Sequence, residues 1–102
     1  MKPIQRAIEH NTHPGEILFY DIIEPNNLTI EKTASLLGVT RPNLSNIVNG
    51  KTAISPLMAI RISKVFGGTA TLWVNLQSAY DLRKAEKEWS SQNISLRKFD
   101  YA

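Results

Sequence analysis

Two helix-length segments separated by only three residues most constrain how this chain can fold. Residues 30–37 and residues 41–49 each carry apolar positions at helical spacing, and residues 38–40 between them read Gly-Val-Thr. Gly38 can take the left-handed conformation that ends a helix, and Thr40 can cap the next one. So short a link holds the two helix axes at one fixed angle. Two helices joined by a three-residue turn that contains glycine form the sequence pattern of a helix-turn-helix.

The remaining segments are also predicted to be helices. A helix opens at Thr12-His13-Pro14 and ends before Pro25, because a helix rarely passes the residue before a proline. Residues 55–56, Ser-Pro, start a fourth helix, and Thr69 caps a fifth over residues 70–88. We expect the inward side chains of the first four helices to be Ile17, Leu18, Ile22, Ile23, Ala34, Leu36, Leu37, Leu44, Ile47, Val48, Met58, Ile62, Val65 and Phe66.

No segment alternates long enough to predict a strand, so the fold class is all-α with five helices. The 102-residue chain divides into a loose N-terminal arm (1–12), a helical domain (13–89) and a polar C-terminal tail (90–102). The N-terminus has no apolar segment of a secretion signal, and no apolar run is long enough to span a membrane. We therefore expect a soluble, cytoplasmic protein.

The longest predicted helix carries two apolar stripes. One consists of Leu72, Trp73, Leu76, Ala79 and Tyr80. Large aromatic side chains dominate burial, so we assign Trp73 and Tyr80 to the core. The second stripe consists of Val74, Leu82, Ala85 and Trp89. One stripe is enough to pack a surface helix, so the second is our candidate interface of a homodimer.

The helix over residues 41–49 is predicted to present a polar face to double-stranded DNA. The candidate DNA-binding residues are Thr29, Thr40, Arg41, Pro42, Asn43, Ser45, Asn46, Asn49 and Lys51. Arg41 can donate to guanine or phosphate, and Asn43 and Asn46 can pair with adenine edges. Pro42 offers an apolar contact to a thymine methyl, while hydroxyls, helix-start amides and Lys51 suit phosphate oxygens. The alternative is that this face is ordinary solvated surface.

Charge and composition agree with a DNA-binding protein and argue against an enzyme. The net charge is +3, and residues 30–64 hold five cations against one acid. Residues 9–24 hold only acids, so one face of the molecule is expected to favour phosphate. The chain has no cysteine, no plausible Ser-His-Asp arrangement and no metal-ligand cluster. We therefore predict no catalytic residues, no metal and no cofactor.

Four motifs in order resemble one known family. They are "HPGEIL" at 13–18, "GVTRPNLSNIVNGK" at 38–51, "ISPLMAIRISKVFG" at 54–67 and "LWVNLQSAYDLRKAE" at 72–86. Together they resemble the Cro/repressor-type helix-turn-helix proteins and, within them, the HigA/VapI-type antitoxins. The resemblance implies a five-helix, lambda-repressor-like DNA-binding domain. It further implies an antitoxin that binds operator DNA as a dimer, represses its own operon and neutralises a small basic mRNA-cleaving toxin encoded by the adjacent gene.

The chain departs from the family pattern at three positions. Ile30 stands where members often carry a glutamine, and Pro42 and Asn46 replace a common glutamine and arginine. These differences bear on the preferred DNA sequence and not on the fold. Two other functions remain open: a stand-alone transcriptional repressor without a toxin partner, and an interaction protein that has lost DNA binding.

Overall fold

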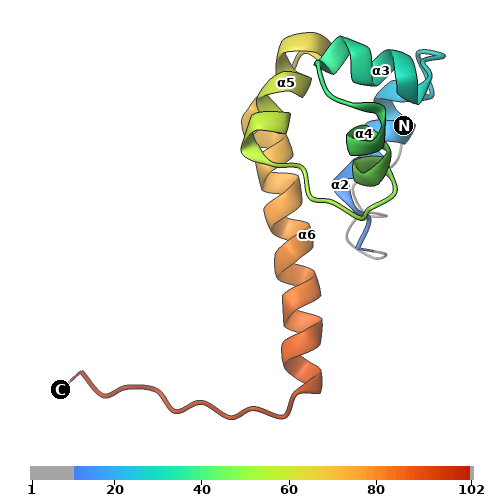
Figure 1. Ribbon diagram of the computed structural model, residues 1–102. Helices are drawn as coiled ribbons and strands as arrows, with labels where there is room; N and C mark the ends of the chain where they lie inside the picture. Colours follow the sequence, from blue (N-terminus) through green and yellow to red (C-terminus); the bar gives the residue numbers. More distant parts are fainter. Residues whose placement is uncertain (1–10, 102) are drawn as a thin grey trace.

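Helices with short connections make up the part of the chain that the computed structural model describes, residues 11–101 (Figure 1). They are α2 (Pro14–Leu18), η1 (Phe19–Ile23), α3 (Ile30–Leu37), α4 (Arg41–Val48), α5 (Pro56–Phe66) and α6 (Ala70–Ser91). Since η1 is a π-helical continuation of α2, these elements form five helical segments, and no strand occurs in the described range. The predicted all-α, five-helix fold is confirmed.

Hydroxyl caps start four of these helices at the predicted residues. The hydroxyl oxygens of Thr29, Thr40, Ser55 and Thr69 each accept a hydrogen bond from the amide three residues later, at 3.0, 3.2, 3.1 and 3.2 Å. Each such cap typically stabilises a helix by about 1 kcal/mol. The short helices α3 and α4 therefore begin at positions that local chemistry alone selects.

The first helix differs from the prediction in its geometry. It is α-helical only to Leu18 and then widens into η1, where the Glu24 amide donates to the Phe19 carbonyl at 2.8 Å. His13 caps its start, because the imidazole Nδ1 accepts from the Gly15 amide at 2.9 Å. The helical stretch ends at Ile23, just before the turn that contains Pro25.

The core lies where the four shorter helices meet the first half of α6. Its fully or nearly fully buried apolar side chains are Leu18, Ile23, Ala34, Leu37, Leu44, Ile47, Ile54, Met58, Ala59, Ile62 and Trp73. The predicted core position of Trp73 is thus confirmed. Each large side chain in this set contributes about 1.5–3 kcal/mol by leaving water.

Three apolar residues predicted to face inward are exposed instead. Leu36, Val65 and Leu72 remain 42, 40 and 50% accessible. Leu36 and Leu72 lie one position before the buried residues Leu37 and Trp73, and neighbouring residues on a helix point about 100° apart. In these two pairs the core covers only the second residue. Val65 lies near the end of α5, whereas the buried residues Met58, Ala59 and Ile62 lie closer to its start.

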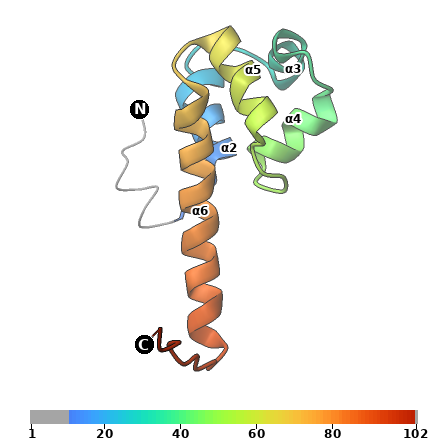
Figure 2. The same cartoon turned by 90° about the vertical axis from the view of Figure 1, so that its left-hand side faces the viewer.

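α6 extends well beyond the bundle. Its first half packs along α5, and its second half projects alone, followed by an extended segment (Figures 1 and 2). The Cα extents of 56 × 26 × 24 Å reflect this projection. The C-terminal segment exposes four large apolar side chains, Ile94, Leu96, Phe99 and Tyr101.

The predicted loose arm meets the described residues only at its end. Residues 1–10 lie outside the described range. Asn11 and Thr12 are not loose: the Asn11 carbonyl oxygen Oδ1 accepts from Arg83 Nε at 2.8 Å, and Thr12 is buried. The segment that enters α2 is therefore fastened to α6.

Candidate nucleic-acid interface

The turn between α3 and α4 has the geometry that its sequence predicted. Gly38 adopts φ 70°, ψ 33°, in the left-handed region. The Val39 amide donates to the Ala34 carbonyl at 3.0 Å, and the Gly38 amide donates to the Ser35 carbonyl at 3.2 Å. This pair of bonds is the Schellman motif that ends a helix without leaving those carbonyls unpaired. The chain can then restart as α4 after only three residues.

α4 is held to the bundle by one narrow apolar side. Leu44 is completely buried, Ile47 is 2% accessible, and Val48 is half-buried against the core. The helix has no other large apolar side chain, so its opposite face is polar. That face begins at Thr40, whose hydroxyl accepts from the Asn43 amide. Because Pro42 has no N–H, Arg41 carries the first-turn amide of α4 that remains directed out of the helix end.

The structure leaves nearly all of the predicted DNA-binding residues accessible. Those exposed are Thr29, Thr40, Arg41, Pro42, Asn43, Asn46, Asn49 and Lys51; Ser45 is half-buried. Arg41, Pro42 and Asn43 form the first turn of α4, and Asn46 lies one turn further on. Ser45 and Asn49 line a groove toward the first helix, whereas Thr40 and Asn43 line one toward α5, so the predicted residues are spread around the exposed surface of α4. A major groove about 12 Å wide admits a whole helix, so residues around this surface can contact one groove.

Two members of this set are already hydrogen-bonded to each other. The Asn49 side-chain amide donates to the Ser45 carbonyl at 2.9 Å and to the Ser45 hydroxyl at 3.3 Å. Both residues line a groove of about 420 Å³ between α4 and the first helix, beside Glu16 and Tyr20. These bonds occupy the Asn49 side-chain nitrogen, so Asn49 could contact a base through its Oδ1, or through the nitrogen only if the pairing breaks.

The loop after α4 folds back onto the helix. The Lys51 and Thr52 amides both donate to the Asn46 carbonyl, at 2.8 and 3.3 Å. Lys51 is thereby held directly beside the end of α4 with its side chain exposed. A cation at the C-terminal end of a helix also interacts favourably with the helix dipole.

A glycine in the first helix allows α2 to touch the backbone of α4. A Cβ at Gly15 would overlap the Ile47 carbonyl oxygen and lie 2.6 Å from the carbonyl carbon. Only a glycine permits this approach. Sequence reasoning missed this role, because a glycine in a helix carries no sign of which distant backbone it meets.

Two further side chains, neither among the predicted DNA-binding or dimer residues, fasten the helix-turn-helix to the rest of the bundle. Gln77 is buried on α6, and its Oε1 accepts from the Ile54 amide at 2.8 Å, which fixes the loop after α4. Arg61 on α5 donates from Nη1 to the Leu37 carbonyl at 3.0 Å.

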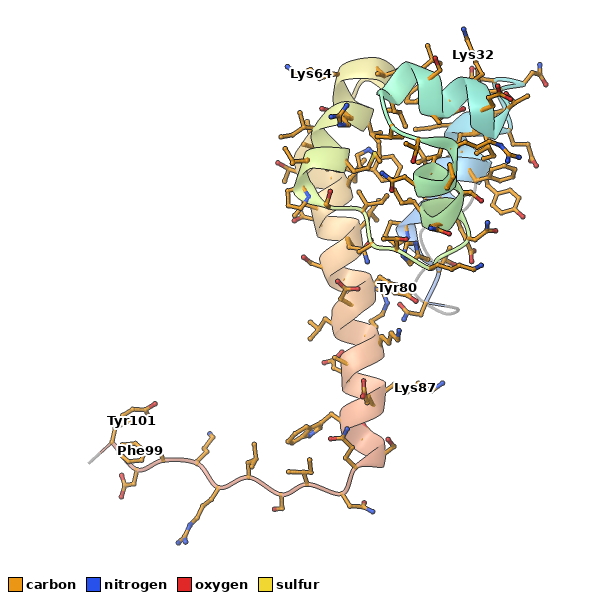
Figure 3. All side chains as sticks on the ribbon, in the orientation of Figure 1. Lys32, Lys64, Tyr80, Lys87, Phe99 and Tyr101 are labelled. Carbon is orange, nitrogen blue, oxygen red and sulfur yellow. The ribbon has the colours of Figure 1, made fainter. Side chains whose placement is uncertain are left out.

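The exposed cations are distributed over several elements around the helix-turn-helix and not on α4 alone. Figure 3 shows Lys32 and Lys64 at the end of the molecule that holds α3, whereas Lys87 lies on the projecting half of α6. Lys32, Arg41 and Lys51 are all exposed on the helix-turn-helix and its following loop. No group of three metal-ligating side chains occurs within residues 11–101.

The candidate dimer residues do not form one uniform surface. Leu82 and Trp89 are 61 and 46% accessible, and Ala85 is also exposed. Val74 is half-buried and packs against the chain's own core. The free part of the stripe is therefore confined to the projecting half of α6.

Among residues 11–101, no helix combines the length and apolar character that crossing a membrane requires.

Comparison with known proteins identifies the family. A family model described as helix-turn-helix matches residues 20–73. The chain belongs to the helix-turn-helix family of HigA- and VapI-type antitoxins and regulators. It is 38% identical to the E. coli regulator YbaQ over 87% of this chain and 79% of that one, and 39% identical to virulence-associated protein I of Dichelobacter nodosus over 80 and 76%. It is also 34% identical to the antitoxin HigA-1 of Vibrio cholerae over 78 and 69%.

Solved structures of this family have the same fold. The antitoxin GraA superimposes with a TM-score of 0.81 at 35% identity, covering 86% of this chain and 96% of that one. The Pseudomonas aeruginosa antitoxin HigA, solved with the higBA promoter, gives a TM-score of 0.77 at 34% identity, covering 82 and 95%. Membership in this family of DNA-binding regulators and antitoxins also confirms that the protein is not an enzyme.

Proposed function

We propose that this protein is an antitoxin and autorepressor that binds operator DNA as a homodimer through α4. The observation that carries the proposal is the first turn of α4, where Arg41, Pro42 and Asn43 are exposed while Leu44 and Ile47 anchor the helix from behind. A helix held by one side and polar on the other is suited to enter a major groove. Similar proteins were solved with a promoter and with operator DNA, which supports the proposal.

Each contact has a distinct expected role. Arg41 donates to guanine or phosphate, Asn43 and Asn46 pair with base edges, and Pro42 contacts a thymine methyl. Thr29, Thr40 and Lys51 bind phosphates. Ser45 and Asn49, which are bonded to each other, support the face and are expected to contact the backbone at most.

The test is fluorescence anisotropy with a labelled duplex from upstream of the gene, at several salt concentrations. Binding should weaken steeply with salt because counterions are released from phosphates. Removing Arg41 and Asn46 together (Arg41→Ala with Asn46→Ala) should lower operator affinity about tenfold or more, since one bidentate base contact is worth about 1–3 kcal/mol. Lys87→Ala is the control for lost charge, because Lys87 lies far from α4 (Figure 3). A double variant that binds as wild type does would exclude α4 as the reading helix.

Dimerisation through the projecting half of α6 is the second part of the proposal. One recognition helix makes few contacts, and a dimer doubles them on half-sites about 34 Å or a multiple apart. Leu82 and Trp89 supply the exposed apolar area, with Ala85 between them; Val74 contributes through its packing on the core. We expect Leu82→Ala with Trp89→Ala to sediment as a monomer. A dimer that persists in this variant would move the interface elsewhere.

Toxin neutralisation in the cytoplasm is the third part. Its support is the similarity to proteins named HigA and GraA antitoxins. The expected partner is a small basic toxin encoded by the adjacent gene, and co-expression with affinity purification of either chain tests the complex. A stand-alone repressor is the second candidate, since the relative YbaQ is named only as a transcriptional regulator. Absence of a toxin-like neighbour that co-purifies would favour it.

A further inference from the structure

A cation on α5 is bonded to the backbone of the α3–α4 turn. Arg61 lies 23 residues beyond Gly38 in sequence, and its Nη1 donates to the Leu37 carbonyl at 3.0 Å and to the Gly38 carbonyl at 3.3 Å. The guanidinium group therefore crosses from one helix to the link between two others. This arginine is one of the five cations in residues 30–64, and by charge alone it resembles a phosphate ligand.

The bonds from Arg61 supply partners for two carbonyls of the turn. The Schellman motif already satisfies the carbonyls of Ala34 and Ser35 from within the chain segment. The Leu37 and Gly38 carbonyls, which follow Leu36 at the end of α3, accept from Arg61 instead. A cation at this position also interacts favourably with the negative end of the α3 dipole. Charge and hydrogen-bond geometry thus select the same side chain.

The Leu37 and Gly38 carbonyls lie where the chain leaves α3 for α4, so the Arg61 contact can influence the orientation of α4. They are the last backbone acceptors before Val39 and Thr40, and α4 begins directly afterwards. α4 itself packs mainly against α2 and α3, so α5 acts on it chiefly through the turn. Glycine is favoured here because φ is +70°. An added Cβ would also lie 2.9 Å from Arg61 Nη1, so the guanidinium group would have to shift.

We propose that Arg61 is a positioning residue for DNA recognition, which sets the angle of α4 by holding the Leu37 and Gly38 carbonyls. The proposal rests on the function proposed above, in which α4 reads operator DNA. Small changes in that angle move Arg41 and Asn46 relative to the bases, whereas phosphate contacts tolerate them better. Arg61 therefore affects the preference for operator over other DNA more than it affects binding to DNA in general.

The test compares Arg61→Ala with Lys64→Ala, which removes the same charge from an exposed position on the same helix. Operator and scrambled duplexes are titrated by anisotropy at a temperature where circular dichroism shows both variants fully folded. We expect Arg61→Ala to weaken operator binding roughly fivefold more than Lys64→Ala does, which corresponds to the net contribution of one typical hydrogen bond. Binding to scrambled DNA and the salt slope should match between the two variants.

A substitution at Gly38 disturbs the same hydrogen bonds between Arg61 and the turn, because its new Cβ would displace the guanidinium group. Gly38→Ala displaces Nη1, and Gly68→Ala is its control, since Gly68 has φ +76° with nothing within 4 Å of an added Cβ. Once Arg61 is already alanine, Gly38→Ala should cost much less operator preference than it does in wild type. If the double variant loses operator preference by the product of the two single-variant factors, the two residues act independently and the coupling between Gly38 and Arg61 is refuted.

The remaining outcomes separate the two proposals. If wild type prefers the operator but Arg61→Ala matches Lys64→Ala on it, only the positioning role is refuted. If the salt slope of Arg61→Ala falls by about one relative to Lys64→Ala, Arg61 is a phosphate ligand instead. If wild type shows no preference for the operator, the proposed function and the positioning role both fail.

Discussion

Replacing Gly15 with alanine tests how closely α2 rests on the recognition helix. Considered locally, the change should stabilise the protein, because alanine is better than glycine in a helix by about 0.5–1 kcal/mol. The tertiary structure predicts the opposite sign. The new Cβ would overlap the Ile47 carbonyl oxygen and come 2.6 Å from its carbon, where ordinary contacts begin at 3.4 Å.

The magnitude follows from the two elements that would have to separate. Both Gly15 and Ile47 are buried, and Leu18 beside them is completely inaccessible to solvent. Moving α2 away from α4 by about an ångström loosens the packing of these side chains, and overpacking of this kind typically costs about 1–3 kcal/mol. For a domain of this size, each kcal/mol lowers the melting temperature by about 4–8 °C. We expect Gly15→Ala to melt about 5–20 °C below wild type.

The assay is thermal and urea unfolding followed by circular dichroism at 222 nm. Ser78→Ala is the control, because Ser78 is exposed in the middle of α6 and gains only helix propensity. It should melt at or slightly above the wild-type temperature. If Gly15→Ala melts as high as Ser78→Ala, the close approach of α2 to the Ile47 carbonyl is wrong.

Three further outcomes follow from buried groups. Burial lowers the pKa of His13, so the unfolded chain binds a proton at a higher pH than the folded protein does, starting below about pH 6.5. The contribution of neutral His13 to stability should therefore be complete above that pH and decline below it. His13→Gln should make the melting temperature depend less on pH in this range. Gln77→Leu leaves the Ile54 amide without its acceptor and should cost about 1–3 kcal/mol in urea unfolding, whereas Asn75→Leu on the exposed side should change little. Trp73→Ala should cost about 3–5 kcal/mol, or prevent folding altogether.

Local chemistry made much of the fold predictable from sequence. The starts of α3, α4, α5 and α6 follow from hydroxyl caps, and the end of α3 follows from Gly38, because each signal acts within about four residues. The exposed polar face of α4 was predictable for the same reason: Leu44 and Ile47 define the buried side, and helical geometry places the rest. These features need no knowledge of distant segments.

Sequence-based prediction of the core failed where a helix carries more apolar residues than the core can bury. Leu36, Val65 and Leu72 are as hydrophobic as their buried neighbours, yet they remain exposed. Periodicity assigns a side of the helix only to within about one residue, and the partner helix decides which candidate is covered. Val74 shows the reverse case, since it packs on the core from a stripe that we expected to be free.

The sequence by itself determined where the helices start, which short link makes the turn, and which polar side chains α4 presents. Only the tertiary structure decided what holds that helix in place: Gly15 beneath it, Gln77 behind its loop, and Arg61 at its turn. The physical reason is range. Caps, turns and helix faces depend on neighbours along the chain, whereas these three contacts join residues 23 or more positions apart and arise only when the helices pack.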